Sequence, residues 1–163
     1  MGYTIHEKSY FPGGRMLYLL FVILFILIES YLKNYVETHF SSKHHKLILR
    51  DKILLRKYHN EGAFLNMMEK KKKLLHAISI FFTFLIAFYF ILTLFQRGNK
   101  ILKAGLTLLL GGAFSNTYDR LTKSYVVDYF SFRTPFPAIN NIVFNLSDFC
   151  IIIGAMLTIL HSK

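Results

Sequence analysis

Cysteine, acidic residues and recognisable hydrolase or metal motifs are scarce or absent in this chain. The single cysteine, Cys150, excludes an internal disulfide and a cysteine-rich metal site. It lies in an apolar run, where a small buried hydrophobic residue is the expected role. No His-Glu-x-x-His motif occurs, and no Ser-His-Asp arrangement or nucleophile-elbow sequence is visible. We therefore expect no metal and no organic cofactor.

Acidic residues are outnumbered by basic ones, nine against twenty, while 53% of the residues are hydrophobic and 17% are aromatic. A soluble core of 163 residues does not need so much apolar surface, so the composition indicates an integral membrane protein. The basic residues cluster beside the apolar runs, which favours contact with anionic lipid headgroups. Nucleic acid is not an expected partner, because no recognisable binding fold accompanies the charge.

Four apolar runs are close to the length of about 20 residues that crosses a bilayer. They predict one membrane domain, residues 1–163, folded as an all-α bundle of four up-and-down transmembrane helices. The first run resembles a signal peptide, but no small-residue cleavage site follows it and it is long enough to span. The predicted spans are residues 16–36, 74–95, 101–118 and 142–160, with long loops at 37–73 and 119–141.

The first long loop contains an alternating apolar pattern. Residues 46–49 and 53–56 read as two short strands around the turn Arg50-Asp51-Lys52. We expect a small β-hairpin or sheet there, lying on the membrane. The run Lys70–Lys73 is typical of a solvated helix entry whose side chains reach lipid phosphates.

The polar residues that are unusual in such a chain fall at one end of the predicted bundle. Ionisable groups in apolar segments cost about 2.5 to 3.5 kcal/mol each at mid-helix, so they indicate a functional site. Three of the four aspartates lie between Gly111 and Asp148. The parity of four spans brings together Glu29, Lys33, Asn60, Asn116, Asp119, Arg120, Asp128, Asn145 and Asp148.

Asp128 and Asp148 are the candidate catalytic pair. At 1.5 Å per residue, Asp148 should lie about 9 Å along the helix from Ile142, just beneath the membrane interface. Partial desolvation there would raise a carboxyl pKa and favour proton sharing with a second carboxyl, as an aspartic protease requires. Chemistry alone leaves a second interpretation open, in which Asp128 caps a helix and Asp148 is a buried packing residue.

Neighbouring residues have structural interpretations as well. Asp119–Arg120 is expected to be an ion pair that fixes the end of the third span. Glu29 and Lys33, at i, i+4 spacing, are expected to form another structural pair.

Three asparagines and two glycines complete the candidate site. Asn60, Asn116 and Asn145 either bind substrate or backbone, or only make hydrogen bonds at helix ends. Gly111 and Gly112 would allow close contact between helices.

Five blocks of this sequence, in order, resemble the lipoprotein signal peptidase (type II signal peptidase) family of bacteria. The first four blocks are Glu29–Lys33, Asn60-Glu61-Gly62-Ala63, Gly111–Arg120 and Val126-Val127-Asp128-Tyr129. The fifth is Phe144-Asn145-Leu146-Ser147-Asp148.

The resemblance implies an aspartyl endopeptidase that removes the signal peptide of prolipoproteins just before their diacylglyceryl-modified cysteine. Asp128 and Asp148 match the catalytic aspartates. It further implies a monomer in the bacterial cytoplasmic membrane, with the active site on the outer side and the termini in the cytoplasm. The family's residues that hold substrate or the peptide antibiotic globomycin match Asn60, Asn116, Arg120 and Asn145, and its supporting residues match Glu29, Lys33, Gly62, Gly112 and Asp119.

The chain departs from the family pattern at six positions. These differences imply altered substrate preference or turnover, or a divergent paralogue, whereas the presence of both aspartates argues against an inactive enzyme. The replacements are Glu29 for Asp, Ser115 and Ser124 for Gly, Ser147 for Ala, Tyr129 for Phe, and Phe64 for a small Ala.

Orientation is the point at which the charge pattern and the resemblance disagree. Thirteen Lys and Arg lie in the two long loops, which by the positive-inside rule would place the candidate site in the cytoplasm. We follow the family, because a loop that forms a hairpin can escape the rule.

Two rival functions are a non-catalytic lipid- or lipoprotein-binding protein on the same scaffold and a small proton channel or transporter. Confinement of the acidic groups to one end counts against the channel.

Overall fold

The computed structural model describes residues 13–41, 45–62 and 72–161, so Ala63, Phe64 and the start of the run at Lys70 lie outside the described residues. Four long helices and a small sheet make up this part of the chain. The helices are α1 (Gly13–His39), α2 (Lys72–Leu94), α3 (Lys100–Lys123), the short α4 (Pro137–Asn140) and α5 (Leu146–His161). The strands are β1 (His45–Ile48), β2 (Ile53–Asn60) and β3 (Val126–Phe132).

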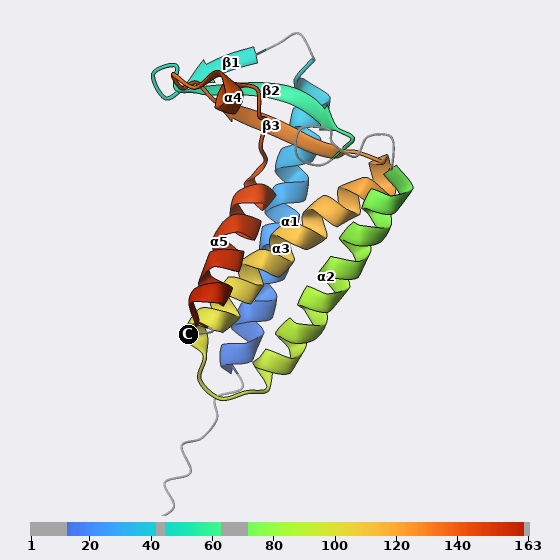
Figure 1. Ribbon diagram of the computed structural model, residues 1–163, viewed down its shortest axis with the longest axis vertical. Helices are drawn as coiled ribbons and strands as arrows, with labels where there is room; N and C mark the ends of the chain where they lie inside the picture. Colours follow the sequence, from blue (N-terminus) through green and yellow to red (C-terminus); the bar gives the residue numbers. More distant parts are fainter. Residues whose placement is uncertain (1–12, 42–44, 63–71, 162–163) are drawn as a thin grey trace, which may run out of the picture.

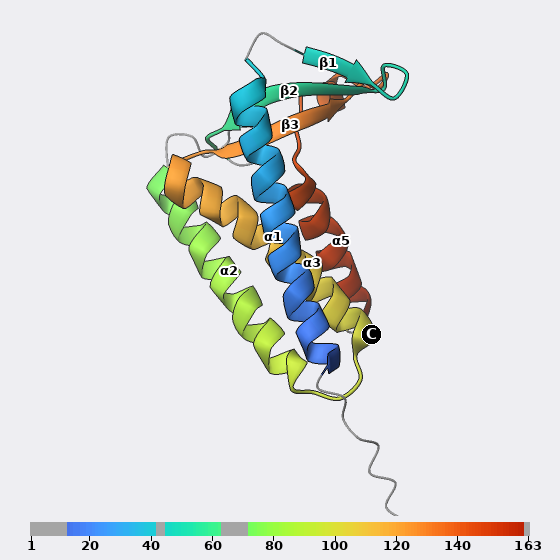
Figure 2. The same cartoon turned by 180° about the vertical axis from the view of Figure 1, so that it is seen from behind.

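The four long helices run side by side, and the sheet lies across one end of them (Figures 1 and 2). α3 is the central helix, because it contacts α1, α2 and α5. The C-terminal ends of α1 and α3 and the N-terminal ends of α2 and α5 all meet at the sheet end (Figure 1). This arrangement brings residues from distant parts of the sequence to one end of the molecule.

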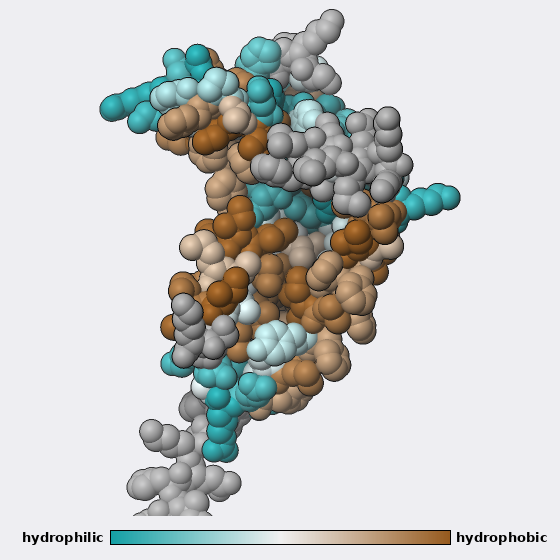
Figure 3. Space-filling view, in the orientation of Figure 1, coloured by the Kyte–Doolittle hydropathy of each residue, from teal (hydrophilic) through white to brown (hydrophobic). Residues whose placement is uncertain are grey.

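Two of the helices, over residues Gly14–His39 and Lys72–Leu94, are long and apolar enough to cross a membrane, and Leu146–Leu160 is a shorter apolar helix. Large apolar side chains cover the outside of these helices, among them Phe21, Leu24, Phe81, Phe84 and Phe88, all more than half exposed. Hydrophobic residues gather over the helices in Figure 3, with hydrophilic residues at both ends. A surface of this kind suits lipid rather than water. A bundle of four spans stays a prediction, since α3 carries many polar residues in its second half.

The sheet has the strand order β1-β2-β3, with both pairs antiparallel. The predicted hairpin is confirmed, with Leu47 opposite Leu54 and the turn at residues 49–52. The sequence predicts a loop over residues 119–141, whereas the structure has a third strand there. β3 is buried on both faces over most of its length, so it lacks the alternation that marks a half-exposed strand. Its Val, Tyr and Phe residues are nevertheless typical of a strand.

Two predicted helix limits are wrong. The third helix continues past residue 118 to Lys123, where Ser124 ends it in the left-handed conformation with φ 67°. The last helix begins at Leu146 rather than residue 142, so Asp148 lies in its first turn and not about 9 Å along it. Residues 142–145 are not helical, because Phe144 pairs with Phe130 of β3 through backbone hydrogen bonds.

Close packing of α3 against α5 depends on glycine. A Cβ on Gly112 would stand 2.5 Å from the carbonyl oxygen of Ser147, and one on Gly154 would stand 2.5 Å from the backbone nitrogen of Leu109. The predicted close helix contact at Gly112 is thus confirmed. A larger apolar core joins α1, α2 and α3, and its buried members are Val22, Phe90, Leu94, Leu102, Leu106 and Leu110.

Candidate active site

Asp128 lies near the start of β3, a strand that is hydrogen-bonded to β2 along one edge and to Phe144 on the other. Its side chain is 1% exposed. The Asn60 amide donates to its Oδ2 at 2.9 Å, and the Asn145 amide donates to its Oδ1 at 2.6 Å. Asn60 is itself held in place, because its Oδ1 accepts from the backbone N–H of Gly62.

Asp148 is the third residue of α5 and forms a reciprocal cap with Asn145. The Asn145 Oδ1 accepts from the Asp148 backbone N–H at 3.0 Å, and the Asp148 Oδ2 accepts from the Asn145 backbone N–H at 3.0 Å. This is the capping-box arrangement, with an aspartate in place of the usual glutamate. The capping role considered for Asp128 thus falls to Asn145, with Asp148 as its partner.

The two aspartates belong to one hydrogen-bonded cluster, in which Asn145 contacts both. Asn116, on α3, donates to Asp148 Oδ1 at 2.9 Å and accepts from Asn145 at 3.2 Å. Three amide side chains from β2, α3 and the start of α5 therefore surround the two carboxyl groups. Asp148 is partly exposed while Asp128 is buried, so water can reach the pair from the Asp148 side.

The surroundings of Asp128 shift the pKa of its carboxyl group. Burial raises the pKa of the Asp128 carboxyl to about 7, and the negative charge of Asp148 adds to this effect. The amides of Asn60 and Asn145 oppose it, because they stabilise the ionised form. The pair accordingly retains a proton up to about neutral pH.

Lys33 of α1 contacts three polar side chains of α3, one of which is Asn116 of the aspartate cluster. Its Nζ lies 3.0 Å from Asp119 Oδ2, donates to Asn116 Oδ1 at 2.9 Å and donates to Ser115 Oγ at 3.0 Å. The predicted pair with Glu29 is present, but at 4.0 Å it is the longest of these contacts. Lys33 therefore fixes the asparagine that contacts Asp148.

The predicted Asp119–Arg120 ion pair is wrong. Asp119 pairs instead with Lys33 and with Lys123, the latter at 2.9 Å. Adjacent residues of a helix point in different directions, whereas residues four apart share a face. Arg120 forms no salt bridge with Asp119, but it interacts electrostatically with Asp128, Asp148 and Asp119, and its Nη1 donates to the backbone oxygen of Asn116 at 3.4 Å. Its Nε is buried and has no hydrogen-bond partner among the described residues.

Glu29 makes contacts that the sequence did not indicate. It is fully buried and accepts from the Tyr129 hydroxyl and from Ser147. Three residues that sequence reasoning did not assign to the site thus belong to its surroundings, namely Lys123, Tyr129 and Ser147. The i, i+4 spacing of Asp119 and Lys123 in the sequence is typical of an ion pair on one helix face. The contacts of Tyr129 and Ser147 bridge about 100 positions and had no local signal.

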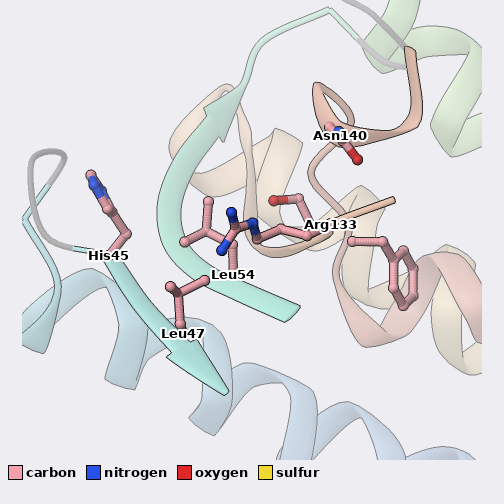
Figure 4. Close-up of a pocket in the computed structure, with 7 residues that line it drawn as sticks. His45, Leu47, Leu54, Arg133 and Asn140 are labelled. Carbon is pink, nitrogen blue, oxygen red and sulfur yellow. The ribbon is translucent and has the colours of Figure 1, made fainter. Parts of the chain in front are cut away.

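A cavity of about 460 Å³ lies on the sheet, and neither aspartate lines it. In Figure 4, Leu47 and Leu54 of the hairpin lie near Arg133, with His45 and Asn140 on either side. Within the described ranges, no three His, Cys, Asp or Glu side chains are grouped so as to hold a metal ion.

Comparison with known proteins identifies the family of the chain. The family model for signal peptidase (SPase) II matches residues 21–163. The chain belongs to the signal peptidase II family. The lipoprotein signal peptidase of Lactobacillus johnsonii is 30% identical over 147 residues, which are 90% of this chain and 92% of the relative. That of Halothermothrix orenii is 31% identical over 141 residues, covering 86% of this chain and 90% of the relative.

The fold is shared with a solved bacterial membrane enzyme. The two structures superpose with a TM-score of 0.77 at 20% sequence identity, over 93% of this chain and 88% of the other. Membership of the signal peptidase II family, together with this fold, makes the chain a membrane protein of a family of proteases.

Proposed function

We propose that this signal peptidase II protein is an aspartyl endopeptidase that removes the signal peptide from diacylglyceryl-modified prolipoproteins, just before the lipidated cysteine. The observation that carries the proposal is the single hydrogen-bonded cluster that contains Asp128 and Asp148, with Asn145 bonded to both. Each relative named above is a lipoprotein signal peptidase, which supports the choice of substrate.

The mechanism follows from sharing one proton between two carboxyl groups. One carboxylate takes a proton from water, which attacks the scissile carbonyl, while the protonated partner donates its proton to the carbonyl oxygen. The tetrahedral intermediate then collapses, the C–N bond breaks, the first carboxyl gives its proton to the leaving nitrogen, and the second takes back the proton from the hydroxyl group as the carboxyl product forms. A pKa of about 7 for Asp128 keeps that proton available near neutral pH. We further propose that Arg120, whose Nε has no hydrogen-bond partner among the described residues, holds a substrate backbone carbonyl together with the amides of Asn60 and Asn116.

The site lies where a membrane-bound substrate would present its cleavage point. The apolar outer surfaces of α1 and α2 suit contact with lipid. Asp128 lies on β3 and Asp148 lies in the first turn of α5, and these two elements meet where the sheet crosses the end of the bundle (Figure 1). We propose a single domain with four spans, the sheet end outside the cytoplasmic membrane and both termini inside. The basic hairpin residues Lys46, Arg50 and Lys52 would then face anionic outer-leaflet headgroups.

The test uses purified protein in detergent micelles with a precursor carrying the diacylglyceryl group. We expect a shift on a gel that corresponds to loss of the signal peptide, and we expect globomycin to block it. The same precursor without the lipid is the matched substrate and should remain uncut. Binding of the lipidated precursor without any product would instead support a non-catalytic binding protein.

The orientation is tested separately. Single cysteines replace Asp51 in the hairpin turn and Asn99 in the turn between α2 and α3, in a background of Cys150→Ser. A thiol reagent that does not cross membranes should label position 51 in intact cells and leave position 99 unlabelled. The reverse pattern contradicts the proposed orientation.

A further inference from the structure

The N-terminus of α5, which carries Asp148, has four backbone N–H groups that its own helix cannot satisfy. The Asn145 N–H donates to Asp148, and the other three also have side-chain acceptors. The Leu146 N–H donates to the Tyr129 hydroxyl at 3.0 Å, and the Ser147 N–H donates to Glu29 Oε1 at 3.3 Å. The Asp148 N–H donates to Asn145. Two of the three acceptors, Tyr129 and Glu29, therefore lie outside the aspartate cluster itself.

Tyr129 and Glu29 are also bonded to each other. The Tyr129 hydroxyl donates to Glu29 Oε2 at 2.9 Å, and the Ser147 hydroxyl donates to Glu29 Oε1 at 3.2 Å. Glu29 and Ser147 are completely buried, and Tyr129 is 9% exposed. A carboxylate at the N-terminal end of a helix is further stabilised by the helix dipole. The three side chains therefore form a buried hydrogen-bonded network.

This network joins the two elements that carry the aspartates. Tyr129 directly follows Asp128 on β3, and its hydroxyl reaches Leu146, two residues before Asp148. The backbone pairing between β3 and the chain before α5 ends at Phe144, before the helix begins. Beyond Phe144, the Tyr129 hydroxyl is a hydrogen-bonding side chain of β3 that reaches the backbone of α5, and the stacked rings of Phe130 and Phe149 form another contact between the two elements.

We propose that Glu29 and Tyr129 are positioning residues that set the placement of Asp148 relative to Asp128, acting through the first turn of α5. The inference rests on the proposed protease function. The hydroxyls of Tyr129 and Ser147 both donate to the Glu29 carboxylate, so the three side chains form one connected unit.

The main variant is Tyr129→Phe, which removes one hydroxyl and keeps the ring. Its matched control is Tyr125→Phe, because the Tyr125 hydroxyl also donates from the region of β3 to a glutamate of α1, Glu37, at 2.7 Å. Tyr129→Phe should lower kcat about tenfold, the loss expected for one hydrogen bond to a charged group, and leave KM within about twofold. Tyr125→Phe should leave both constants near the wild-type values.

A double-variant cycle separates positioning from general loss of structure. Glu29→Gln and Tyr129→Phe should together lower kcat no more than the larger single effect, because they act through one bond. Effects that multiply, or a kcat for Tyr129→Phe equal to that of Tyr125→Phe, would overturn the inference. A fall in activity that only follows the folded fraction would also overturn it.

A readout without catalysis keeps this test separate from the proposed function. Hydrogen exchange of the backbone amides in residues 144–149 should be faster in Tyr129→Phe than in Tyr125→Phe, because the Leu146 N–H has lost its acceptor. Equal exchange in the two variants contradicts the inference even if the wild-type protein cleaves no precursor. Cleavage by the wild type with equal exchange would leave the protease function standing and remove only the positioning role.

Discussion

Substitutions of Asn145 should separate its role in capping α5 from its hydrogen bond to Asp128. Its amide donates to Asp128 at 2.6 Å, and its side-chain oxygen accepts from the Asp148 backbone N–H at 3.0 Å. Asn145→Ala removes both contacts. Asn145→Ser retains an oxygen that can cap α5 but has no amide to reach Asp128, so it is the matched control.

The contacts give the size of the effect. Loss of a helix N-cap costs about 1 kcal/mol of unfolding free energy. Loss of a buried hydrogen bond to a charged group costs about 1.5 to 3 kcal/mol. Asn145→Ala should therefore lower the unfolding free energy by about 2 to 4 kcal/mol, and Asn145→Ser by about 1 kcal/mol less. Thermal unfolding in detergent micelles measures both.

The pH dependence of cleavage tests the electrostatic part. Activity of the wild type should fall as the pH rises through about 7, because the pair then loses the proton it shares. The Asn145 amide lowers the pKa of Asp128, so its removal raises that pKa. Both variants should have kcat reduced about tenfold or more, with an alkaline limit moved to higher pH. An alkaline limit that stays in place or moves to lower pH would refute the electrostatic reasoning.

For three further substitutions, one local feature of the structure predicts the effect on stability. Gly112→Ala places a Cβ 2.5 Å from the Ser147 carbonyl oxygen, so it should lower the unfolding free energy by about 1 to 3 kcal/mol and reduce activity through displacement of α5. Lys33→Met leaves Asp119 buried without its closest cation on α1 and should cost about 3 to 5 kcal/mol, measured as the folded fraction in micelles. Ser124→Gly relieves a left-handed residue at φ 67° and should raise the unfolding free energy by about 1 kcal/mol.

Matched controls exist for two of these variants. Gly111→Ala meets only the Phe25 ring, which can rotate, so it should cost less than Gly112→Ala. Lys57→Met removes a pair with Glu37 that is partly exposed, and it should cost about 1 kcal/mol or less. If either control variant proves as destabilising as its partner, the contact assigned to that partner is not the cause.

The order and positions of the long helices could be predicted because apolar runs are local signals. The hairpin was found for the same reason, since its alternation lies within about ten residues. β3 was missed because it is buried on both faces and therefore does not alternate. The end of α3 was placed five residues too early, because its last turn is polar and is held by the Asp119–Lys123 pair and the Lys33 contact rather than by lipid.

Parity placed the polar residues at one end of the bundle, and the structure brings Asp128, Asp148, Asn60, Asn116 and Asn145 together there. Spacing could not show which of them touch. Asp119–Arg120 was expected as a pair from adjacency alone, although adjacent helical residues diverge. The Glu29–Tyr129 contact joins residues 100 positions apart, and only the fold creates it.

The most direct test of the account is single-turnover cleavage of a diacylated precursor by three aspartate variants. Asp128→Asn and Asp148→Asn should each abolish cleavage while the protein still inserts into the membrane and still binds the lipidated precursor. Asp51→Asn, in the exposed turn of the hairpin, is the matched control and should cleave like the wild type. Cleavage at the wild-type rate by either of the first two variants would contradict the paired action of Asp128 and Asp148.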